Sequence, residues 1–238
     1  MVLAMVELYR LITTDDIKPQ VITVIGTGIV MLASTFFIAS GILPLQILSV
    51  PVLLIFLLFF FELFRRNGKL SNNLAYTCFG LIYVSLPLSL LPFLGYPKGL
   101  LEGYTPDIIL GYFILLWIYD TGAYIVGSFI GRHKIMKNIS PGKSWEGFSG
   151  GLIISIGVAL AVAELFPVLN RTDWIIIAAL TAVTGTLGDF FESGLKRNAG
   201  VKDSGNLLPG HGGILDRIDS VLLSVPFVFI FLLIRQFL

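Results

Sequence analysis

The stretch S-G-L-K-R-N-A-G-V-K-D-S-G-N-L-L-P-G-H-G-G-I-L-D-R-I-D-S, residues 193–220, is a polar segment between two long apolar runs. Its charged and titratable side chains are Lys196, Arg197, Lys202, Asp203, His211, Asp216, Arg217 and Asp219. Polar groups at or near a bilayer are costly, and they persist where they bind ions, substrates or each other. Basic side chains can hold phosphates, carboxylates can hold a divalent cation, and the glycine-rich turn at 209–213 lets backbone approach a ligand closely. The segment therefore predicts a phosphate-handling site in a membrane protein.

The sequence around this segment has the composition of a membrane protein. Of its 238 residues, 55% are apolar and only 13% are charged, whereas a soluble domain carries about 25% charged residues. Seven apolar runs each approach the roughly 20 residues that a spanning helix needs: 21–41, 43–61, 73–94, 107–131, 148–169, 173–188 and 219–237. We expect an all-α polytopic membrane protein with about seven transmembrane helices, in which residues 1–238 form a single integral-membrane domain.

The lysine and arginine residues predict how the chain crosses the membrane. With the N-terminus in the cytoplasm, thirteen of the sixteen basic residues fall on the cytoplasmic side, and only Lys98, Arg171 and Arg235 fall on the other. Cytoplasmic segments carry such an excess of basic residues. The bias places loops 131–147 and 189–218 in the cytoplasm, where nucleotides are found. We expect a protein of the inner (plasma) membrane whose polar pocket faces the cytoplasm.

A first polar cluster, Asp120-Thr121-Gly122-Ala123-Tyr124, lies deep in the fourth apolar run. A carboxylate near the middle of a spanning helix costs several kcal/mol against lipid, so Asp120 is expected to face a cavity or a partner. One interpretation is a binding site. The alternative is a hydrogen bond to a neighbouring helix, with the small residues allowing close packing.

A second cluster, Ser140-Pro141-Gly142-Lys143-Ser144-Trp145-Glu146-Gly147, opens the fifth run. It is not a Walker phosphate loop, because Lys137 stands where that motif needs glycine and no β-strand is expected before it. A lysine and free N–H groups at a helix N-terminus can still hold a phosphate, which makes Lys143 and Ser144 candidate substrate-binding residues. The alternative is an ordinary positively charged cytoplasmic loop.

The third cluster is the opening stretch, extended back to Gly188 and Asp189. On a helix, four of its residues recur at three- and four-residue steps and share one face: Asp189, Ser193, Lys196 and Arg197. Asp216 and Asp219 are likewise three residues apart at the start of the last run. Two helices could then each offer a carboxylate to one pocket, and oxygen ligands suit Mg²⁺. The alternative is a set of Asp–Arg ion pairs that solvate a loop.

These residues resemble the signature of the CDP-diacylglycerol synthases (phosphatidate cytidylyltransferases) along one spaced pattern, Gly188-Asp189-x3-Ser193-x2-Lys196-Arg197-x4-Lys202-Asp203-x5-Pro209-Gly210-His211-Gly212-Gly213-x2-Asp216-Arg217-x-Asp219-Ser220. The first two clusters are similar to the family's other polar motifs. The resemblance begins near residue 5 and covers the rest of the chain. It implies that CTP and phosphatidate react to give CDP-diacylglycerol and pyrophosphate in phospholipid biosynthesis.

The resemblance also implies ions, partners and residue roles. It implies dependence on Mg²⁺, a potassium ion beside it, a homodimer, and metal ligands at Asp189 and Asp216. The residues expected to act in catalysis are Asp189, Lys196, Arg197, Lys202, Asp203, Asp216, Arg217 and Asp219. Those expected to bind substrate are Asp120, Lys143, Ser144, Ser193, His211, Gly212 and Gly213. The expected partners are CTP, a phosphatidate lipid and the membrane, without nucleic acid.

The sequence departs from the family pattern in two places, and two other functions remain possible for a chain with these polar motifs. Ser144 stands where the family usually has threonine, and family members usually carry about two further apolar helices ahead of Glu7.

A CTP-dependent polyprenol or phytol kinase would use similar acidic and basic loops but would release CDP. An ion-coupled transporter could use Asp120 and Asp189, although no inverted repeat is present and the charges gather on one side of the membrane rather than at its middle.

Overall fold

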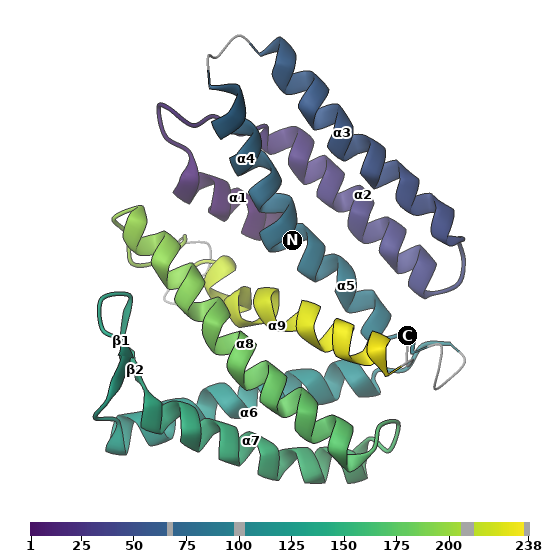
Figure 1. The fold of residues 1–238 in the computed structure, drawn as a ribbon. Coiled ribbons are helices and arrows are strands. Elements are labelled where there is room, and N and C mark those ends of the chain that lie inside the picture. Colours follow the sequence, from purple (N-terminus) through teal and green to yellow (C-terminus); the bar gives the residue numbers. More distant parts are fainter. Residues whose placement is uncertain (66–68, 98–102, 206–211, 236–238) are drawn as a thin grey trace. The chain divides into compact units, whose positions relative to one another are not determined.

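The computed structural model describes residues 1–65, 69–97, 103–205 and 212–235, which are almost entirely helical (Figure 1). Within this described part, seven helical segments are long and apolar enough to cross a membrane: Val21–Ala39, Leu45–Phe64, Leu70–Leu94, Asp107–Ile130, Trp145–Leu165, Arg171–Asn198 and Leu215–Ile234. The expected all-α polytopic fold is confirmed, and the protein is an integral membrane protein.

The chain forms two compact units. The first unit consists of Met1–Phe93 and Leu195–Ile218, and the second consists of Leu94–Gly194 and Asp219–Leu238. Helices α8 (Arg171–Asn198) and α9 (Leu215–Ile234) contribute residues to both. Each unit is described by itself below, and the expectation of a single domain stays a prediction.

The first unit is built from short and long apolar helices. Its elements are α1 (Val2–Ile12), α2 (Val21–Ala39), the 3-10 turn η1 (Leu45–Leu48), α3 (Ser49–Phe64), α4 (Leu70–Gly80), the π-helical turn η2 (Leu81–Ser85) and α5 (Leu86–Leu94). Helices α2 and α3 run antiparallel to each other (Figure 1). Most of α3 is exposed apolar surface, as expected of a helix that contacts lipid.

A buried polar network joins three of these helices. Glu62, near the end of α3, is only 1% exposed. Its Oε2 accepts hydrogen bonds from Gln20 Nε2 (2.8 Å) and Arg65 Nη1 (2.9 Å), and its Oε1 accepts one from Asn73 Nδ2 (2.9 Å). Both carboxylate oxygens are therefore satisfied, as a buried charge requires. The network fixes the start of α2, the end of α3 and the start of α4.

Helix α1 packs against α4 through Tyr9. The Tyr9 hydroxyl donates to the Thr77 carbonyl at 2.7 Å, and burial raises the pKa of this phenol. A Cβ atom at Gly80 would overlap the Tyr9 ring, so the contact needs glycine there. The one π-helical turn of the described chain follows Gly80 directly.

The second unit contains α6 (Asp107–Ile130), α7 (Trp145–Leu165), most of α8 and most of α9. Helices α6 and α7 touch backbone to backbone. A Cβ atom at Gly151 would lie 2.8 Å from both the Ala123 nitrogen and the Tyr119 oxygen, and one at Gly147 would lie 2.7 Å from the Ala123 oxygen. Small residues permit such close approach of spanning helices. The glycines thereby fix the distance between two walls of the site described below.

Polar contacts hold α8 and α9 to their neighbours within this unit. At one end, Arg235 Nε of α9 pairs with Asp173 Oδ1 in the first turn of α8 at 3.0 Å, and Asp173 is only 1% exposed. The Tyr112 hydroxyl of α6 hydrogen-bonds the Ser224 hydroxyl of α9 at 2.5 Å. These contacts pair polar groups that would otherwise be costly in a membrane-spanning region.

Two local features differ from the sequence-based expectations. The sixth apolar run was expected to end at residue 188, but α8 continues to Asn198, where Lys196 and Arg197 suit a helix C-terminus and no proline intervenes. The chain leaves the helix through Gly200, whose φ is +71°. A short antiparallel hairpin of β1 (Lys134–Met136) and β2 (Ser140–Ser144) was not expected and precedes α7.

Candidate active site

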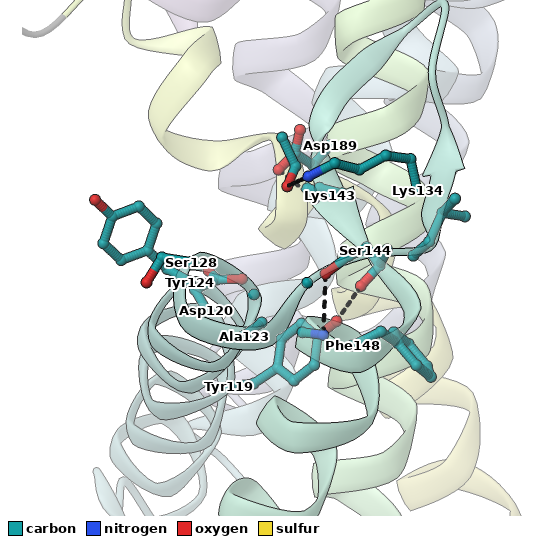
Figure 2. Close-up of a pocket in the computed structure, with 16 residues that line it drawn as sticks. Tyr119, Asp120, Ala123, Tyr124, Ser128, Lys134, Lys143, Ser144, Phe148 and Asp189 are labelled. Atoms are coloured by element: carbon teal, nitrogen blue, oxygen red, sulfur yellow. Dashed lines mark hydrogen bonds and ion pairs between the residues drawn. The ribbon is translucent and has the colours of Figure 1, made fainter.

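A polar pocket of about 540 Å³ opens among α6, the β-hairpin, α7 and α8 in the second unit (Figure 2). Its volume lies within the range of small-molecule sites. Its polar lining comes from Asp120, Ser128, Lys134, Lys143, Ser144, Thr186 and Asp189. Asp120, Lys143 and Asp189, from three separate sequence clusters, therefore meet at one cavity.

An ion pair between Lys143 and Asp189 crosses the pocket (Figure 2). Lys143 extends from β2, and its ammonium also lies 5.1 Å from the centre of the Phe190 ring. Asp189 Oδ1 accepts a long hydrogen bond from the Ser193 hydroxyl one turn later on α8, at 3.4 Å. Both charged side chains are partly exposed, so a ligand can reach them.

Two more carboxylates belong to the same electrostatic neighbourhood. Asp120 of α6 and Asp219 of α9 each interact with Lys143 and with Asp189. Helices α8 and α9 approach closely here, because a Cβ atom at Gly188 would overlap the Asp219 carbonyl oxygen. The pocket lining itself carries two carboxylates, Asp120 and Asp189, and two ammonium groups, Lys134 and Lys143, so it offers oxygen ligands for a cation and positive charge for a phosphate.

The donor chemistry suits a hard cation that also has ligands from a substrate. Among the described residues, no three acidic, histidine or cysteine side chains are arranged to hold a metal by themselves. Mg²⁺ differs from Zn²⁺ in this respect, because it is usually bound by one or two carboxylates plus water and phosphate oxygens. A pocket with carboxylate and hydroxyl oxygens and two lysines fits that mode of binding.

A second acidic cluster lies in the first unit, around Asp216 in the first turn of α9. Its Oδ1 accepts from Lys196 Nζ at 2.6 Å. Its Oδ2 accepts from the Gly213 N–H (2.7 Å), the Ser204 N–H (3.0 Å) and the Ser204 hydroxyl (2.9 Å). Charge-assisted bonds of this kind hold a side chain firmly. The carboxylate of Asp216 is therefore fixed by residues before and after the glycine-rich turn.

Backbone conformation at the end of this turn also requires glycine. Gly212 has a φ of +77°, in the left-handed region that glycine adopts without strain. A Cβ atom there would lie 2.9 Å from Asp216 Oδ2. The group that Gly212 and Gly213 approach closely in this structure is the Asp216 carboxylate. Their predicted contact with substrate stays a prediction, and His211 lies outside the described residues.

Comparison with known proteins identifies relatives over nearly the whole chain. The sequence profile of the cytidylyltransferase family matches residues 1–235. The chain belongs to this family. The phosphatidate cytidylyltransferase of Staphylococcus saprophyticus is 38% identical over 237 residues, covering 97% of this chain and 87% of the relative. The Staphylococcus aureus protein of the same name is 35% identical over 238 residues, covering 98% and 87%.

A third relative matches more strongly over a shorter region. The phosphatidate cytidylyltransferase of Staphylococcus epidermidis is 48% identical over 127 residues, which is 52% of this chain and 48% of the relative. Membership of the cytidylyltransferase family confirms the resemblance inferred from the spaced pattern. It also makes the protein a nucleotidyltransferase by family.

The hairpin that carries Lys143 corrects one argument from the sequence. The Walker motif was excluded partly because no β-strand was expected before it, and β1 contradicts that expectation. The exclusion still holds because position 137 is lysine. Ser144 is almost fully buried, and its hydroxyl accepts the Gly147 N–H at 3.2 Å as the N-cap of α7. Its predicted contact with substrate stays a prediction.

Glu146 holds the other side of the hairpin. Its carboxylate accepts the N–H groups of Arg132 (3.1 Å) and His133 (3.1 Å), and it also pairs with His133 Nδ1. The His133 side chain is 80% exposed, in agreement with its interpretation as a surface residue. Glu146, in the first turn of α7, thus ties the segment before β1 to the helix that follows β2.

The remaining predicted residues lie on the surface of the first unit. Arg197, Lys202, Asp203 and Arg217 are all exposed. Arg197 donates to the Val201 carbonyl at 3.2 Å, which stabilises the end of α8. Asp189 and Asp216 belong to different units, so their joint role as metal ligands stays a prediction.

One residue of the Asp216 cluster was missed by the sequence interpretation. Glu7 in α1 is completely buried, and its Oε2 accepts the Leu215 N–H at 2.8 Å. The available signal was a single carboxylate in the otherwise apolar run Val2–Tyr9. A lone acidic residue in such a run has a specific partner. The partner itself could not be named, because it lies more than 200 residues later in the chain.

Proposed function

We propose that this protein is a phosphatidate cytidylyltransferase that converts CTP and phosphatidate to CDP-diacylglycerol and pyrophosphate. The observation that carries the proposal is the pocket that brings Asp120 to the ion pair of Lys143 with Asp189. The names of its relatives support the choice of substrates. An integral membrane protein suits a reaction between a lipid and a water-soluble nucleotide, since the acyl chains can stay in the bilayer.

The proposed reaction exchanges one phosphorus–oxygen bond for another. An oxygen of the lipid phosphate attacks the α-phosphorus of CTP, and the bond from that phosphorus to the bridging oxygen breaks, so that pyrophosphate leaves. A phosphate monoester has a second pKa of about 6 and is ionised near neutral pH, so the nucleophile needs no strong base. The protein's task is therefore to position the two phosphates and to offset their negative charge.

The basic residues are assigned to that task. In the pocket, Lys143 is placed to contact a phosphate oxygen once Asp189 is neutralised by another cation. In the first unit, Lys196 pairs with Asp216 and would likewise contact a phosphate oxygen once a cation neutralises that carboxylate. The exposed Arg197, Lys202 and Arg217 are available to bind triphosphate or lipid phosphate, with arginine best suited to a two-pronged contact.

Asp189 and Asp216 remain the proposed Mg²⁺ ligands. Each carboxylate accepts a lysine ammonium and a serine hydroxyl, so each lies in surroundings that already favour a cation and oxygen donors. When bound, Mg²⁺ would supply Lewis-acid polarisation of the phosphates and neutralise part of their charge. The potassium ion that the resemblance implies is also proposed, and it rests on the resemblance alone.

The orientation, the membrane and the assembly are also proposals. The excess of basic residues in loops 131–147 and 189–218 supports a pocket that faces the cytoplasm, where CTP is available. The location proposed with it is the cell's inner (plasma) membrane. A homodimer is proposed on the resemblance alone.

The test is a defined reaction with purified, detergent-solubilised protein, CTP, phosphatidate and Mg²⁺, in which pyrophosphate, CDP and CDP-lipid are measured separately. The proposal expects pyrophosphate and CDP-diacylglycerol in equal amounts, and neither product without phosphatidate. Release of CDP with a phosphorylated lipid would indicate a kinase instead. Absence of both nucleotide products from folded protein would reject nucleotidyl transfer to phosphatidate.

A further inference from the structure

Glu7 places a buried negative charge beside the segment that carries Asp216, and both belong to the first unit. The Glu7 side chain is 0% exposed. Its Oε2 accepts the Leu215 N–H at 2.8 Å and lies 3.3 Å from the Ser204 hydroxyl. Its Oε1 is buried without a hydrogen-bond partner within the described residues. An incompletely satisfied buried carboxylate is costly, so a specific role must offset its presence.

The contacts of Glu7 reach residues on either side of the glycine-rich turn. Leu215 immediately precedes Asp216 and begins helix α9, whose first N–H groups have no partner within the helix. A carboxylate that accepts such an N–H stabilises the start of the helix and interacts favourably with its dipole. Ser204 lies on the other side of the turn and donates its own N–H to Asp216 Oδ2 at 3.0 Å.

Ser204 connects the two carboxylates directly. Its hydroxyl lies 2.9 Å from Asp216 Oδ2 and 3.3 Å from Glu7 Oε2, so its single hydrogen serves one of them while the oxygen stays between both. The packing leaves no room for larger residues. A Cβ atom at Gly205 would lie 2.6 Å from Glu7 Oε1, and one at Gly213 would lie 2.5 Å from Glu7 Oε2.

We infer that Glu7 is a positioning residue, which fixes the direction of the Asp216 carboxylate through Ser204 and the first N–H of α9. The inference rests on the proposed function of Asp216 in cytidylyl transfer. It adds α1 to the elements that form the site, although α1 carries none of the signature residues. Glu7 itself touches neither substrate nor metal in this assignment.

The test compares Glu7→Gln with wild type in three measurements: CDP-lipid formation, the Mg²⁺ concentration for half-maximal activity, and hydrogen–deuterium exchange of peptides covering 201–205 and 212–218. Glutamine keeps the size and one acceptor oxygen but loses the charge. A hydrogen bond to a charged group influences a rate by about ten- to hundredfold. We expect kcat to fall by this factor, the Mg²⁺ requirement to rise, and exchange to become faster in these two segments.

The matched control is Glu164→Gln, which removes an exposed carboxylate that pairs with the exposed Arg171. It should match wild type in all three measurements. Ser204→Ala provides a second route, because it removes the hydroxyl between the two carboxylates but keeps the backbone N–H bond to Asp216. Its effect on kcat and that of Glu7→Gln should be less than additive, since both act through one network.

Several outcomes would overturn the inference. One is a Glu7→Gln protein with kcat within about twofold of wild type and an unchanged Mg²⁺ requirement. Another is a loss of activity that parallels the loss of folded protein, with the folded fraction keeping wild-type kcat and Mg²⁺ requirement. If wild type forms no CDP-lipid, the proposed function fails, and the exchange measurement still decides: unchanged exchange at 212–218 in Glu7→Gln would reject a positioning role.

Discussion

Lys143 and Asp189 form an ion pair across the pocket, although the two residues come from a β-hairpin and a spanning helix separated by the whole of α7. In the proposed function, Lys143 neutralises Asp189 before substrate binds and donates to a phosphate oxygen after a cation has bound Asp189. This relationship leads to the first prediction.

Replacing Lys143 with methionine should lower CDP-lipid formation by about ten- to hundredfold, because a charge-assisted contact to the phosphate is lost. Lys143→Arg should retain part of the activity, since the charge is kept but its reach differs. Lys137→Met is the control, because Lys137 is exposed in the same hairpin and does not line the pocket. Initial rates at saturating lipid measure the effect. Equal losses in the Lys143→Met and Lys137→Met proteins would contradict a specific role.

Replacing Asp216 with asparagine should remove nearly all activity and leave the protein folded in the membrane. Asparagine keeps the size of the side chain but lacks the anionic oxygen that a hard cation requires. Higher Mg²⁺ should restore little, since both affinity and geometry depend on the lost ligand. Activity normalised to folded protein is the measurement.

A companion double mutant separates metal binding from charge pairing at Asp216. The structure pairs Asp216 with Lys196 at 2.6 Å. If Asp216 served only to balance that lysine, Asp216→Asn combined with Lys196→Met would recover activity, as expected when a pair matters rather than one charge. We expect no recovery. Rescue by the double substitution would end the assignment of Asp216 as a ligand.

Replacing Gly151 with alanine should destabilise the protein, whereas Gly157→Ala in the same helix should not. A Cβ atom at position 151 would lie 2.8 Å from backbone atoms of α6, while position 157 faces open space. Overpacking of this kind costs about 1–3 kcal/mol. Thermal unfolding in detergent should show a lower midpoint for Gly151→Ala only. Similar midpoints for both variants would show that α6 and α7 can separate without cost.

The orientation prediction can be checked with single cysteines in a Cys78→Ala background. Cysteine at Lys137, in the hairpin, and cysteine at Arg171, the first residue of α8, should react with a membrane-impermeant reagent from opposite sides of sealed vesicles. The two positions lie beyond opposite ends of the spanning helix α7. In right-side-out vesicles, only the Arg171→Cys protein should react. Labelling of both positions from the same side would reject the proposed topology.

Much of the fold could be predicted because its signals are long and local. Seven apolar runs correspond to the seven spanning segments, since burial in lipid requires the same kind of residue along a whole helix. The ends were less accurate. The sixth apolar run ends at residue 188, whereas α8 continues to Asn198, as the helical spacing of Asp189, Ser193 and Lys196 indicated. The hairpin was missed because its first strand has only three residues.

Site residues could be predicted where they belong to a recognisable sequence pattern. Residues that join the site only through packing of distant parts of the chain could not. Asp120, Lys143 and Asp189 each stood out as polar groups in apolar surroundings, and the pocket brings them together. Glu7 stood out less, and nothing near it in the sequence indicates Ser204 or Leu215 as its partners. Contacts between residues so far apart in the chain depend on the packing of whole helices, which local patterns do not specify.

The glycine contact between α6 and α7 restricts how substrate selectivity could be redesigned. Gly147 and Gly151 leave no space for a side chain, so the wall they form cannot be reshaped by substitution. Variation must come from residues that line the pocket while keeping an exposed side, such as Tyr124 and Ser128. A library limited to those two positions would explore new head-group or acyl preferences without disturbing the helix pair.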